Sequence, residues 1–260
     1  MERDLAGRVA LVTGASRRAG LGFAVASRLA RRGAALLVHG HPAGDRVRGG
    51  AWPDRGGMAA VAQALRAQDG PVETVEADLG DPDAPAYLVE EAWRRLGRLD
   101  VVVANHAYWS GEGIETLTAE DLDLHLAVNV RASLLLVAAF AAQHDGSPGG
   151  RVVLMLSGTH RGPMTGELGY VASKGALHQL VPSLAAELAP RRVTVNGVNP
   201  GPTDTGWISE AFRPSLLGRF PMGRVGEPDD AARLVAWLAS DEAAWITGQV
   251  IDSEGGFVRG

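Results

Sequence analysis

The chain has 260 residues, of which 46% are hydrophobic and 21% charged, a composition that is ordinary for a folded globular protein and excludes wholesale disorder. The net charge of −5, without a long basic run, argues against nucleic-acid binding, and the longest apolar run, residues 134–142, is too short to cross a membrane. The absence of cysteine excludes disulfides and thiolate chemistry, and the N-terminus lacks a signal-peptide pattern, so we expect a cytoplasmic protein.

Short aliphatic runs alternate with longer segments of helical periodicity along the whole chain. Most of these runs are apolar on both faces, as in strands that helices cover on both sides. The alternation predicts a single α/β domain over residues 1–260, doubly wound around a mostly parallel, seven-stranded sheet. In chain order, the predicted elements are strand Val9–Thr13, helix Phe23–Arg32, strand Leu36–His39, helix Met58–Gln68, strand Val72–Ala77, helix Pro85–Leu96, strand Val101–Ala104, helix Ala119–Gln143, strand Val152–Leu156, helix Tyr170–Leu188, strand Val193–Val198, helix Asp229–Ala239 and strand Gln249–Ile251.

Three segments need separate interpretation. Residues Asp121–Val130 alternate apolar and polar side chains as a strand does, but Thr118 forms a capping-box pattern with Asp121 and an alanine-rich stretch follows, which favours a helix. The long segments His41–Gly57 and Trp207–Arg224 are predicted to be surface loops. We predict that residues 207–224 form a lid over the substrate.

A glycine-rich turn joins the first predicted strand to the first predicted helix. Gly14, Gly20 and Gly22 allow the backbone to approach a pyrophosphate closely, and the N-terminus of the helix offers free N–H groups to it. The turn therefore predicts a site for dinucleotide phosphates. The other residues of the turn that we assign to this site are Ser16, Arg17, Arg18 and Leu21.

Further motifs follow in order: Asp78-Leu79, Asn105-His106-Ala107, Asn129-Val130, Ser157, Tyr170-x-x-x-Lys174, Asn199-Pro200-Gly201 and Gly255-Gly256. With the glycine-rich turn, this set resembles the short-chain dehydrogenase/reductase family over nearly the whole chain, and most of all the classical branch with β-ketoacyl-ACP reductases. The resemblance implies a Rossmann fold and an enzyme that acts on carbonyl or CH–OH groups with a nicotinamide cofactor. Two positions depart from the family pattern: five residues separate Gly14 from Gly20 instead of three, and His106 replaces a small residue that lines the cofactor.

The end of the second predicted strand bears on the choice of cofactor. An acid there would accept the ribose hydroxyl of NAD(H), but this chain has His39-Gly40-His41. NADP(H) is therefore favoured over NAD(H), with Arg17, Arg18, Arg46 and Arg48 as partners for the additional phosphate, unless these arginines are ordinary solvated surface charges. By the resemblance, Asp78 binds the adenine amino group, and the remaining cofactor residues are Leu79, Asn105, Tyr170, Lys174, Pro200, Gly201, Thr203 and Thr205.

Tyr170 and Lys174 are four residues apart and therefore neighbours on one helical face. An ammonium group lowers the pKa of a nearby phenol and prepares it for proton exchange, and Lys174 is the only lysine of the chain. Ser157, at the end of a strand, can hold the reacting carbonyl oxygen. The resemblance assigns Asn129 a water that relays protons from Lys174, although a satisfied core amide would fit the sequence as well.

These residues predict an NADP(H)-dependent oxidoreductase that transfers hydride between the nicotinamide and a ketone, such as a 3-oxoacyl group, or a secondary alcohol. One alternative is an NAD-dependent alcohol dehydrogenase of the same family. A non-catalytic nucleotide sensor is a second alternative. The wide glycine spacing suggests an enoyl reductase, but that branch separates its Tyr and Lys by seven residues, and Glu167 stands at that position here.

The substrate is expected to be a small carbonyl or alcohol compound, and Trp109 and Trp207 are candidates for its pocket. An acyl-carrier arm could meet Arg213, Arg219 and Arg224. No metal is expected, because the histidines lack metal-ligand spacing. The resemblance implies a homotetramer or a dimer, for which Leu134–Ala142 and Leu177–Leu188 offer apolar faces.

Overall fold

The computed structural model describes residues 3–41, 56–68 and 70–259. Within these residues, seven parallel strands form one sheet in the order β3-β2-β1-β4-β5-β6-β7, and each pair of neighbours is in parallel register. The predicted seven-stranded parallel sheet is confirmed. The strands are β1 (Val9–Val12), β2 (Ala35–Gly40), β3 (Val72–Glu76), β4 (Val101–Ala104), β5 (Gly150–Met155), β6 (Val193–Asn199) and β7 (Val250–Asp252).

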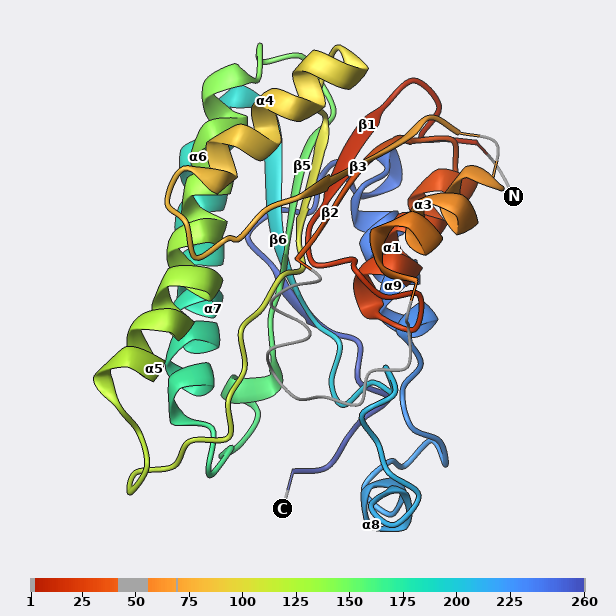
Figure 1. The fold of residues 1–260 in the computed structure, drawn as a ribbon. Helices are drawn as coiled ribbons and strands as arrows, with labels where there is room; N and C mark the ends of the chain where they lie inside the picture. Colours follow the sequence, from red (N-terminus) through yellow and green to blue (C-terminus); the bar gives the residue numbers. More distant parts are fainter. Residues whose placement is uncertain (1–2, 42–55, 69, 260) are drawn as a thin grey trace.

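Helices cover both faces of the sheet, as Figure 1 shows. On one face lie α1 (Leu21–Arg31), α3 (Gly57–Arg66) and α9 (Pro228–Leu238). On the other lie α4 (Ala84–Leu96), α6 (Ala132–Gln143) and α7 (Leu168–Leu188). This is the doubly wound arrangement that the strand–helix alternation predicts.

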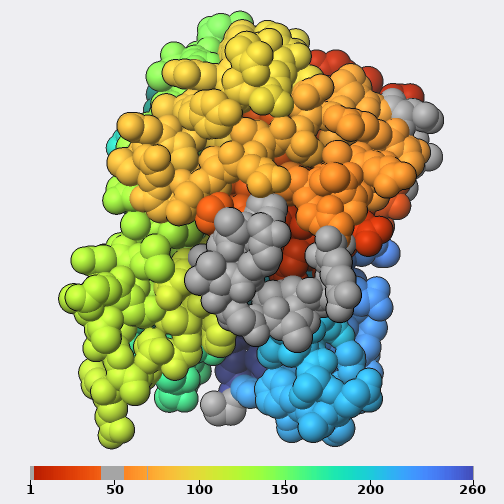
Figure 2. Space-filling view, viewed as in Figure 1, coloured from red at the N-terminus to blue at the C-terminus, as the bar shows by residue number. Residues whose placement is uncertain are grey.

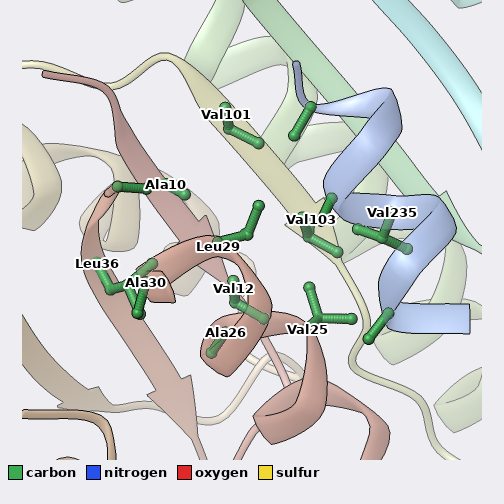
Figure 3. Packing of buried hydrophobic residues seen from close by; sticks show 14 of the residues in the cluster. Ala10, Val12, Val25, Ala26, Leu29, Ala30, Leu36, Val101, Val103 and Val235 are labelled. Atoms are coloured by element: carbon green, nitrogen blue, oxygen red, sulfur yellow. The ribbon is translucent and has the colours of Figure 1, made fainter. Parts of the chain in front are cut away.

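The period of two along each strand divides the core into two layers. In β1, Ala10 and Val12 belong to the cluster that packs against α1 and α9, whereas Leu11 belongs to the cluster under α4, α6 and α7. Val25 of α1 and Val235 of α9 close the first layer in Figure 3. Each such buried aliphatic side chain contributes about 1.5–3 kcal/mol, so a slip of one residue in β1 would be strongly destabilising.

The ambiguous segment after β4 is helical, as the capping pattern favours. The Thr118 side chain accepts a hydrogen bond from the Asp121 N–H (3.1 Å) and begins α5 (Ala119–His125). A π-helical stretch, Leu126–Arg131, then leads directly into α6. The sequence pattern does not predict this wider turn, because tertiary contacts described below set it.

Together these segments form the one described helix that is long and apolar enough to cross a membrane. Half of its most apolar window is buried inside the fold, and Leu136, Val137 and Phe140 pack against the sheet. A core helix of this kind passes the same length and composition test, so the helix is accounted for by its packing.

The carboxyl ends of the strands point toward the lower part of Figure 1, where the segments that follow β1, β4, β5 and β6 meet. The segment 207–224 contains α8 (Arg213–Leu217) and has a small apolar cluster of its own: Ile208, Leu216, Phe220, Val225 and Phe257. Figure 2 shows this segment (light blue) and the region of α5 (yellow-green) as two protrusions on opposite sides. Its action as a lid stays a prediction. Residues 42–55 of the predicted loop, including Arg46 and Arg48, lie outside the described residues.

Candidate active site

A cleft of about 270 Å³ opens where the loops after β1 and β4 meet the end of β2. Arg18, Gly22, Tyr170, Lys174, Pro200, Gly201 and Thr203 do not line it. His106, at a position that lines the cofactor in the family, also lines it, and so do His41, Ala107 and Val128, which the sequence did not assign to the cofactor. The predicted cofactor residues that line it are Gly14, Ser16, Arg17, Gly20, Leu21, His39, Asp78, Leu79, Asn105 and Thr205.

The glycine-rich turn is held close to the loop after β4. Gly14 has φ 67°, and a Cβ there would lie 2.7 Å from the His106 Cα. A Cβ on Gly22 would lie 2.6 Å from the Gly14 carbonyl oxygen and 2.7 Å from Asn105 Nδ2. The Asn105 amide donates to the carbonyls of Thr13 (3.0 Å) and Gly14 (2.9 Å). Gly22 and Asn105 therefore shape the turn by packing and hydrogen bonding.

The same turn presents the N-terminus of α1 to the cleft. No acidic residue stands in the first turn of α1, so nothing there opposes the attraction of its N–H groups and dipole for a phosphate. Arg17 lies on the cleft and donates to the Thr205 carbonyl (3.3 Å), whereas Arg18 is exposed. These donors and the close backbone approach fit a nicotinamide dinucleotide, held by the turn, Arg17 and Thr205.

His39 supports the turn from within the protein. The ring is 2% exposed, its Nδ1 accepts from the Gly14 N–H (3.3 Å), and its Nε2 donates to the Ala77 carbonyl (3.0 Å). Both ring nitrogens thus contact the chain itself, although the ring lines the cleft. Farther out, His41 Nε2 lies 3.9 Å from an Asp78 carboxylate oxygen, so these two side chains form the exposed rim of the cleft.

The unexpected His106 has its own partners. Its ring is hydrogen-bonded to the Thr13 hydroxyl (2.7 Å) and the Ser133 hydroxyl (3.3 Å). Burial, with smaller effects of the nearby His39 and Lys174 charges, lowers the pKa of His106 to about 3. The imidazole is therefore neutral at physiological pH and forms part of the cleft wall.

Tyr170 lies in the first turn of α7, and Lys174 follows one turn later. The Lys174 side chain is 2% exposed, its Nζ donates to the Met155 carbonyl at the end of β5 (2.7 Å), and the Nζ is 5.8 Å from the centroid of the Tyr170 ring. The two side chains therefore share one face of the helix, as the spacing predicts.

The electrostatic effect on Tyr170 differs from the prediction. Burial raises the pKa of Tyr170 to about 12, and it outweighs a hydrogen bond with Ser157, which lowers this pKa; the charge of Glu167 raises it further. Burial also lowers the pKa of Lys174 to about 8. The pKa of Tyr170 is therefore raised overall and not lowered as expected, because desolvation dominates.

Ser157 follows β5 and stands at the start of a short 3-10 turn, Gly158–His160. Its hydroxyl is hydrogen-bonded with Tyr170 and also reaches the sulfur of Met164 (3.8 Å). The structure thus brings together Ser157, Tyr170 and Lys174 from β5 and α7, as the sequence predicts.

Asn129 is fully buried in the π-helical stretch. Its Oδ1 accepts from the Tyr108 N–H (2.6 Å), and its Nδ2 donates to the Tyr108 carbonyl (2.9 Å) and the Ser173 hydroxyl (2.9 Å). The amide is therefore satisfied by the protein and ties the loop after β4 to α7. Its role in a proton relay stays a prediction.

The comparisons with known proteins agree with this geometry. A family model described as enoyl-(acyl carrier protein) reductase matches residues 14–258. The uncharacterized oxidoreductase YjdA of Bacillus subtilis is 42% identical over 255 residues, which are 97% of this chain and 98% of that protein. A solved double mutant of a Serratia marcescens short-chain dehydrogenase/reductase is 36% identical, with a TM-score of 0.85 over 98% of this chain and 99% of its own. The chain belongs to the short-chain dehydrogenase/reductase family.

A second solved structure bears on the cofactor. A blue fluorescent protein from a metagenomic library, solved in complex with NADPH, is 32% identical, with a TM-score of 0.86 over 98% of this chain and all of its own. This chain is thus an oxidoreductase of the family, acting on carbonyl or CH–OH groups with a nicotinamide cofactor. Its Tyr170 and Lys174 are four residues apart, as in the classical branch.

Aromatic side chains stand exposed around the reactive residues. Trp109 is 55% and Trp207 45% exposed, and the Trp207 indole N–H donates to the Thr203 carbonyl (2.7 Å), which joins the segment 207–224 to the loop after β6. The Trp109 indole N–H donates to a Glu167 carboxylate oxygen (3.0 Å). The sequence did not identify Glu167 as a site residue, because a lone Glu before a helix is usually an ordinary surface charge.

The arginines that could meet an acyl-carrier arm are engaged within the protein. Arg213 pairs with Asp204, and Arg224 pairs with Asp230 (2.7 Å). The Arg219 Nε donates to the Val258 carbonyl (2.9 Å). The charges of Arg213 and Arg224 are thus paired with carboxylates, whereas Arg219 contacts only a carbonyl, and their role toward an acyl-carrier arm stays a prediction.

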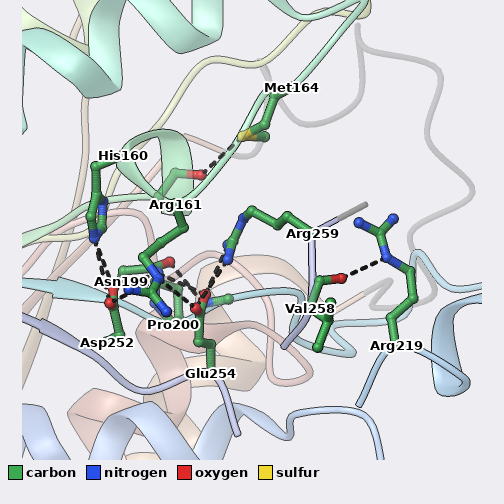
Figure 4. A network of polar contacts seen from close by, with 12 residues as sticks. His160, Arg161, Met164, Asn199, Pro200, Arg219, Asp252, Glu254, Val258 and Arg259 are labelled. Atoms are coloured by element: carbon green, nitrogen blue, oxygen red, sulfur yellow. Dashed lines mark hydrogen bonds and ion pairs between the residues drawn. The ribbon is translucent and has the colours of Figure 1, made fainter. Parts of the chain in front are cut away.

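The C-terminal residues join the reactive loop to the segment 207–224, as Figure 4 shows. Arg259 makes two hydrogen bonds to Glu254 (3.0 and 2.8 Å), and its guanidinium lies so close to Gly158 that a Cβ there would be 1.7 Å from it. Val258 exchanges hydrogen bonds with Arg219. The tail therefore packs against Gly158, the residue after Ser157, a contact that no sequence motif predicts.

Proposed function

We propose that this protein is an NADP(H)-dependent reductase that converts a ketone to a secondary alcohol. The observation that carries the proposal is the hydrogen-bonded pair of Ser157 and Tyr170, with Lys174 beneath it. This group follows β5 and begins α7, at the same edge of the sheet as the cleft for the dinucleotide.

Each side chain has a definite task in this reaction. A bound nicotinamide cofactor supplies hydride chemistry at the carbonyl carbon. The Ser157 hydroxyl donates a hydrogen bond to the carbonyl oxygen as negative charge develops on it. Tyr170, with a pKa of about 12, is protonated at neutral pH and can transfer its Oη proton to that oxygen. Lys174 and the N-terminus of α7 stabilise the phenolate that remains.

The choice of NADP(H) over NAD(H) is supported by the described end of β2. His39, Gly40 and His41 provide no carboxylate to accept a ribose hydroxyl or repel a phosphate, and Arg17 lies on the cleft. A structural relative at 32% identity binds NADPH. We expect kcat/KM to be higher with NADPH than with NADH, and Arg17→Ala to reduce it more for NADPH. A preference for NADH would favour the alternative NAD-dependent alcohol dehydrogenase.

The activity itself is tested with the purified chain and a panel of ketones, followed by the loss of NADPH absorbance. We expect turnover of at least one ketone and a rate about 10²–10⁴-fold lower with Tyr170→Phe. A chain that binds NADPH tightly but reduces no ketone would instead be a nucleotide sensor. We also propose that the protein acts in the cytoplasm on small ketones rather than on carrier-bound ones, because the charges of Arg213 and Arg224 are already paired with carboxylates.

We further propose a homo-oligomer, a dimer or tetramer, in which α6 and α7 meet a second copy. The outer face of α6 leaves Leu135 39% exposed, and α7 carries the partly buried Leu180 and Leu184. Light scattering of the purified protein tests this, and a monomeric mass would contradict it.

A further inference from the structure

A carboxylate that the reaction described above does not use stands three residues before Tyr170. Glu167 precedes α7, is partly buried, and makes no capping hydrogen bond to that helix. One of its oxygens, Oε2, accepts the indole N–H of Trp109 (3.0 Å). The next residue, Leu168, donates its N–H to the Glu112 carbonyl (3.0 Å), so the loop after β4 and the start of α7 are joined at this point.

The charge of the carboxylate acts on the reactive hydroxyl. Residues three apart at the start of a helix are neighbours, and the charge of Glu167 raises the pKa of Tyr170. Among the described residues, no arginine, lysine or histidine pairs with Glu167, and Trp109 is its one hydrogen-bond partner. The carboxylate oxygen Oε1 therefore retains its capacity to accept a hydrogen bond.

A carboxylate in this position imposes a choice between substrates. It accepts a hydrogen bond from a hydroxyl or amino group strongly, because the acceptor is charged, and it repels an anion. The half-exposed indole of Trp109 beside it offers an apolar surface on which a ring can pack.

We propose that Glu167, held by Trp109, is a specificity-determining residue that binds a hydroxyl or amino group of the ketone substrate. The substrate class is then a ketone whose carbonyl is attached to an apolar ring that carries a hydrogen-bond donor. The inference rests on the proposed ketone reductase function and deepens it. By the same proposal, the negative charge of Glu167 disfavours ketones that carry a carboxylate.

Three ring ketones of similar size test this choice: meta-hydroxyacetophenone, meta-methoxyacetophenone and meta-acetylbenzoate. We expect the wild-type kcat/KM to fall in that order. Glu167→Gln keeps the shape of the side chain and removes its charge, so it should raise the acetylbenzoate-to-methoxy ratio about tenfold and reduce the hydroxy-to-methoxy ratio severalfold. Glu115→Gln removes the same charge from an exposed position in the loop after β4 and should change neither ratio.

Two further measurements distinguish substrate binding from a structural role. Oxidation of the corresponding alcohols should rise with pH as Tyr170 loses its proton, and Glu167→Gln should shift the midpoint to lower pH because a negative charge near the phenolate is gone. Trp109→Phe keeps the ring but frees the carboxylate, so it should reduce the hydroxy-to-methoxy ratio while Glu167 still excludes the anion.

The outcomes separate the two proposals. If the wild type reduces ketones but Glu167→Gln leaves the substrate ratios and the pH midpoint unchanged, the role of Glu167 is wrong and the reductase function stands. If the wild type reduces none of the ketones in a broad panel, the reductase function is wrong, and the role of Glu167 falls with it.

Discussion

Replacing Lys174 by Met should make the protein more stable and inactive at the same time. Burial lowers the pKa of Lys174 from 10.5 to about 8, so keeping the ammonium in the folded state at neutral pH costs about 3 kcal/mol. Methionine fills a similar space without charge but loses the hydrogen bond to the Met155 carbonyl, about 1 kcal/mol. The net gain in the free energy of unfolding is about 2 kcal/mol, or a Tm increase of about 5 °C.

The pH dependence of this difference identifies its cause. The folded protein releases the Lys174 proton near pH 8 and the unfolded chain near pH 10.5, so between these values the unfolded state binds more protons and the wild type gains stability as pH rises. The advantage of Lys174→Met should therefore be full at neutral pH and nearly absent near pH 10.

Urea unfolding at both pH values measures this, with Lys174→Arg as the matched control. Arginine keeps its charge throughout, so this variant should lack the wild-type gain in stability at high pH. If Lys174→Met were no more stable than the wild type at neutral pH, or if its advantage persisted unchanged near pH 10, the ammonium would not carry the cost that its burial implies.

Three other variants test separate parts of the structure. Tyr170→Phe should lower kcat by about 10²–10⁴-fold while the affinity for NADPH, measured by fluorescence titration, stays close to that of the wild type; unchanged turnover would remove Tyr170 from the chemistry. Gly22→Ala places a Cβ 2.6 Å from the Gly14 carbonyl oxygen, so thermal unfolding should show a loss of about 1–3 kcal/mol and NADPH should bind more weakly; full stability and affinity would mean that the turn can move aside. The Asp229 carboxylate has a pKa of about 2, mainly because of its hydrogen bonds with Arg28. The pair thus contributes to the free energy of unfolding above pH 4, and this contribution is lost as pH falls toward 2. Asp229→Asn should therefore cost about 1 kcal/mol at neutral pH, because the pair is partly exposed. An equal cost at pH 2 would contradict the assignment.

The fold could be predicted because its signals are local and repeated. Strands such as Val101–Ala104 are apolar on both faces, and each is followed by a segment of helical period, which specifies a parallel sheet without any distant contact. The π-helical stretch around Asn129 was not predictable in the same way. Its amide is fixed by Tyr108 and Ser173, which come from two other elements, and such contacts leave no period in the sequence.

The sequence predicted which residues form the catalytic group, but not their pKa values or all of their hydrogen-bond partners. Spacing and resemblance place Ser157, Tyr170 and Lys174 together, and the structure agrees. His39 was assigned to the cofactor, yet its ring nitrogens bind Gly14 and Ala77, a use that depends on the register of β2 against its neighbours. Glu167 could not be identified from the sequence, because its hydrogen-bond partner Trp109 lies 58 residues earlier in the chain.

The direction of the pKa shifts shows why spacing alone misleads about charge. On an exposed helix, an ammonium one turn from a phenol would stabilise the phenolate, and the pKa of Tyr170 would fall. Burial removes water from both groups and favours the neutral phenol and the neutral amine, which raises the pKa of Tyr170 to about 12 and lowers the pKa of Lys174 to about 8. The two pKa values, which are similar on free side chains, therefore lie well apart in the folded protein. An arginine would keep its charge in the same place, whereas Lys174, with a pKa of about 8, can release its proton, and that is a physical reason for a lysine at position 174 in a chain that uses arginine at every other basic position.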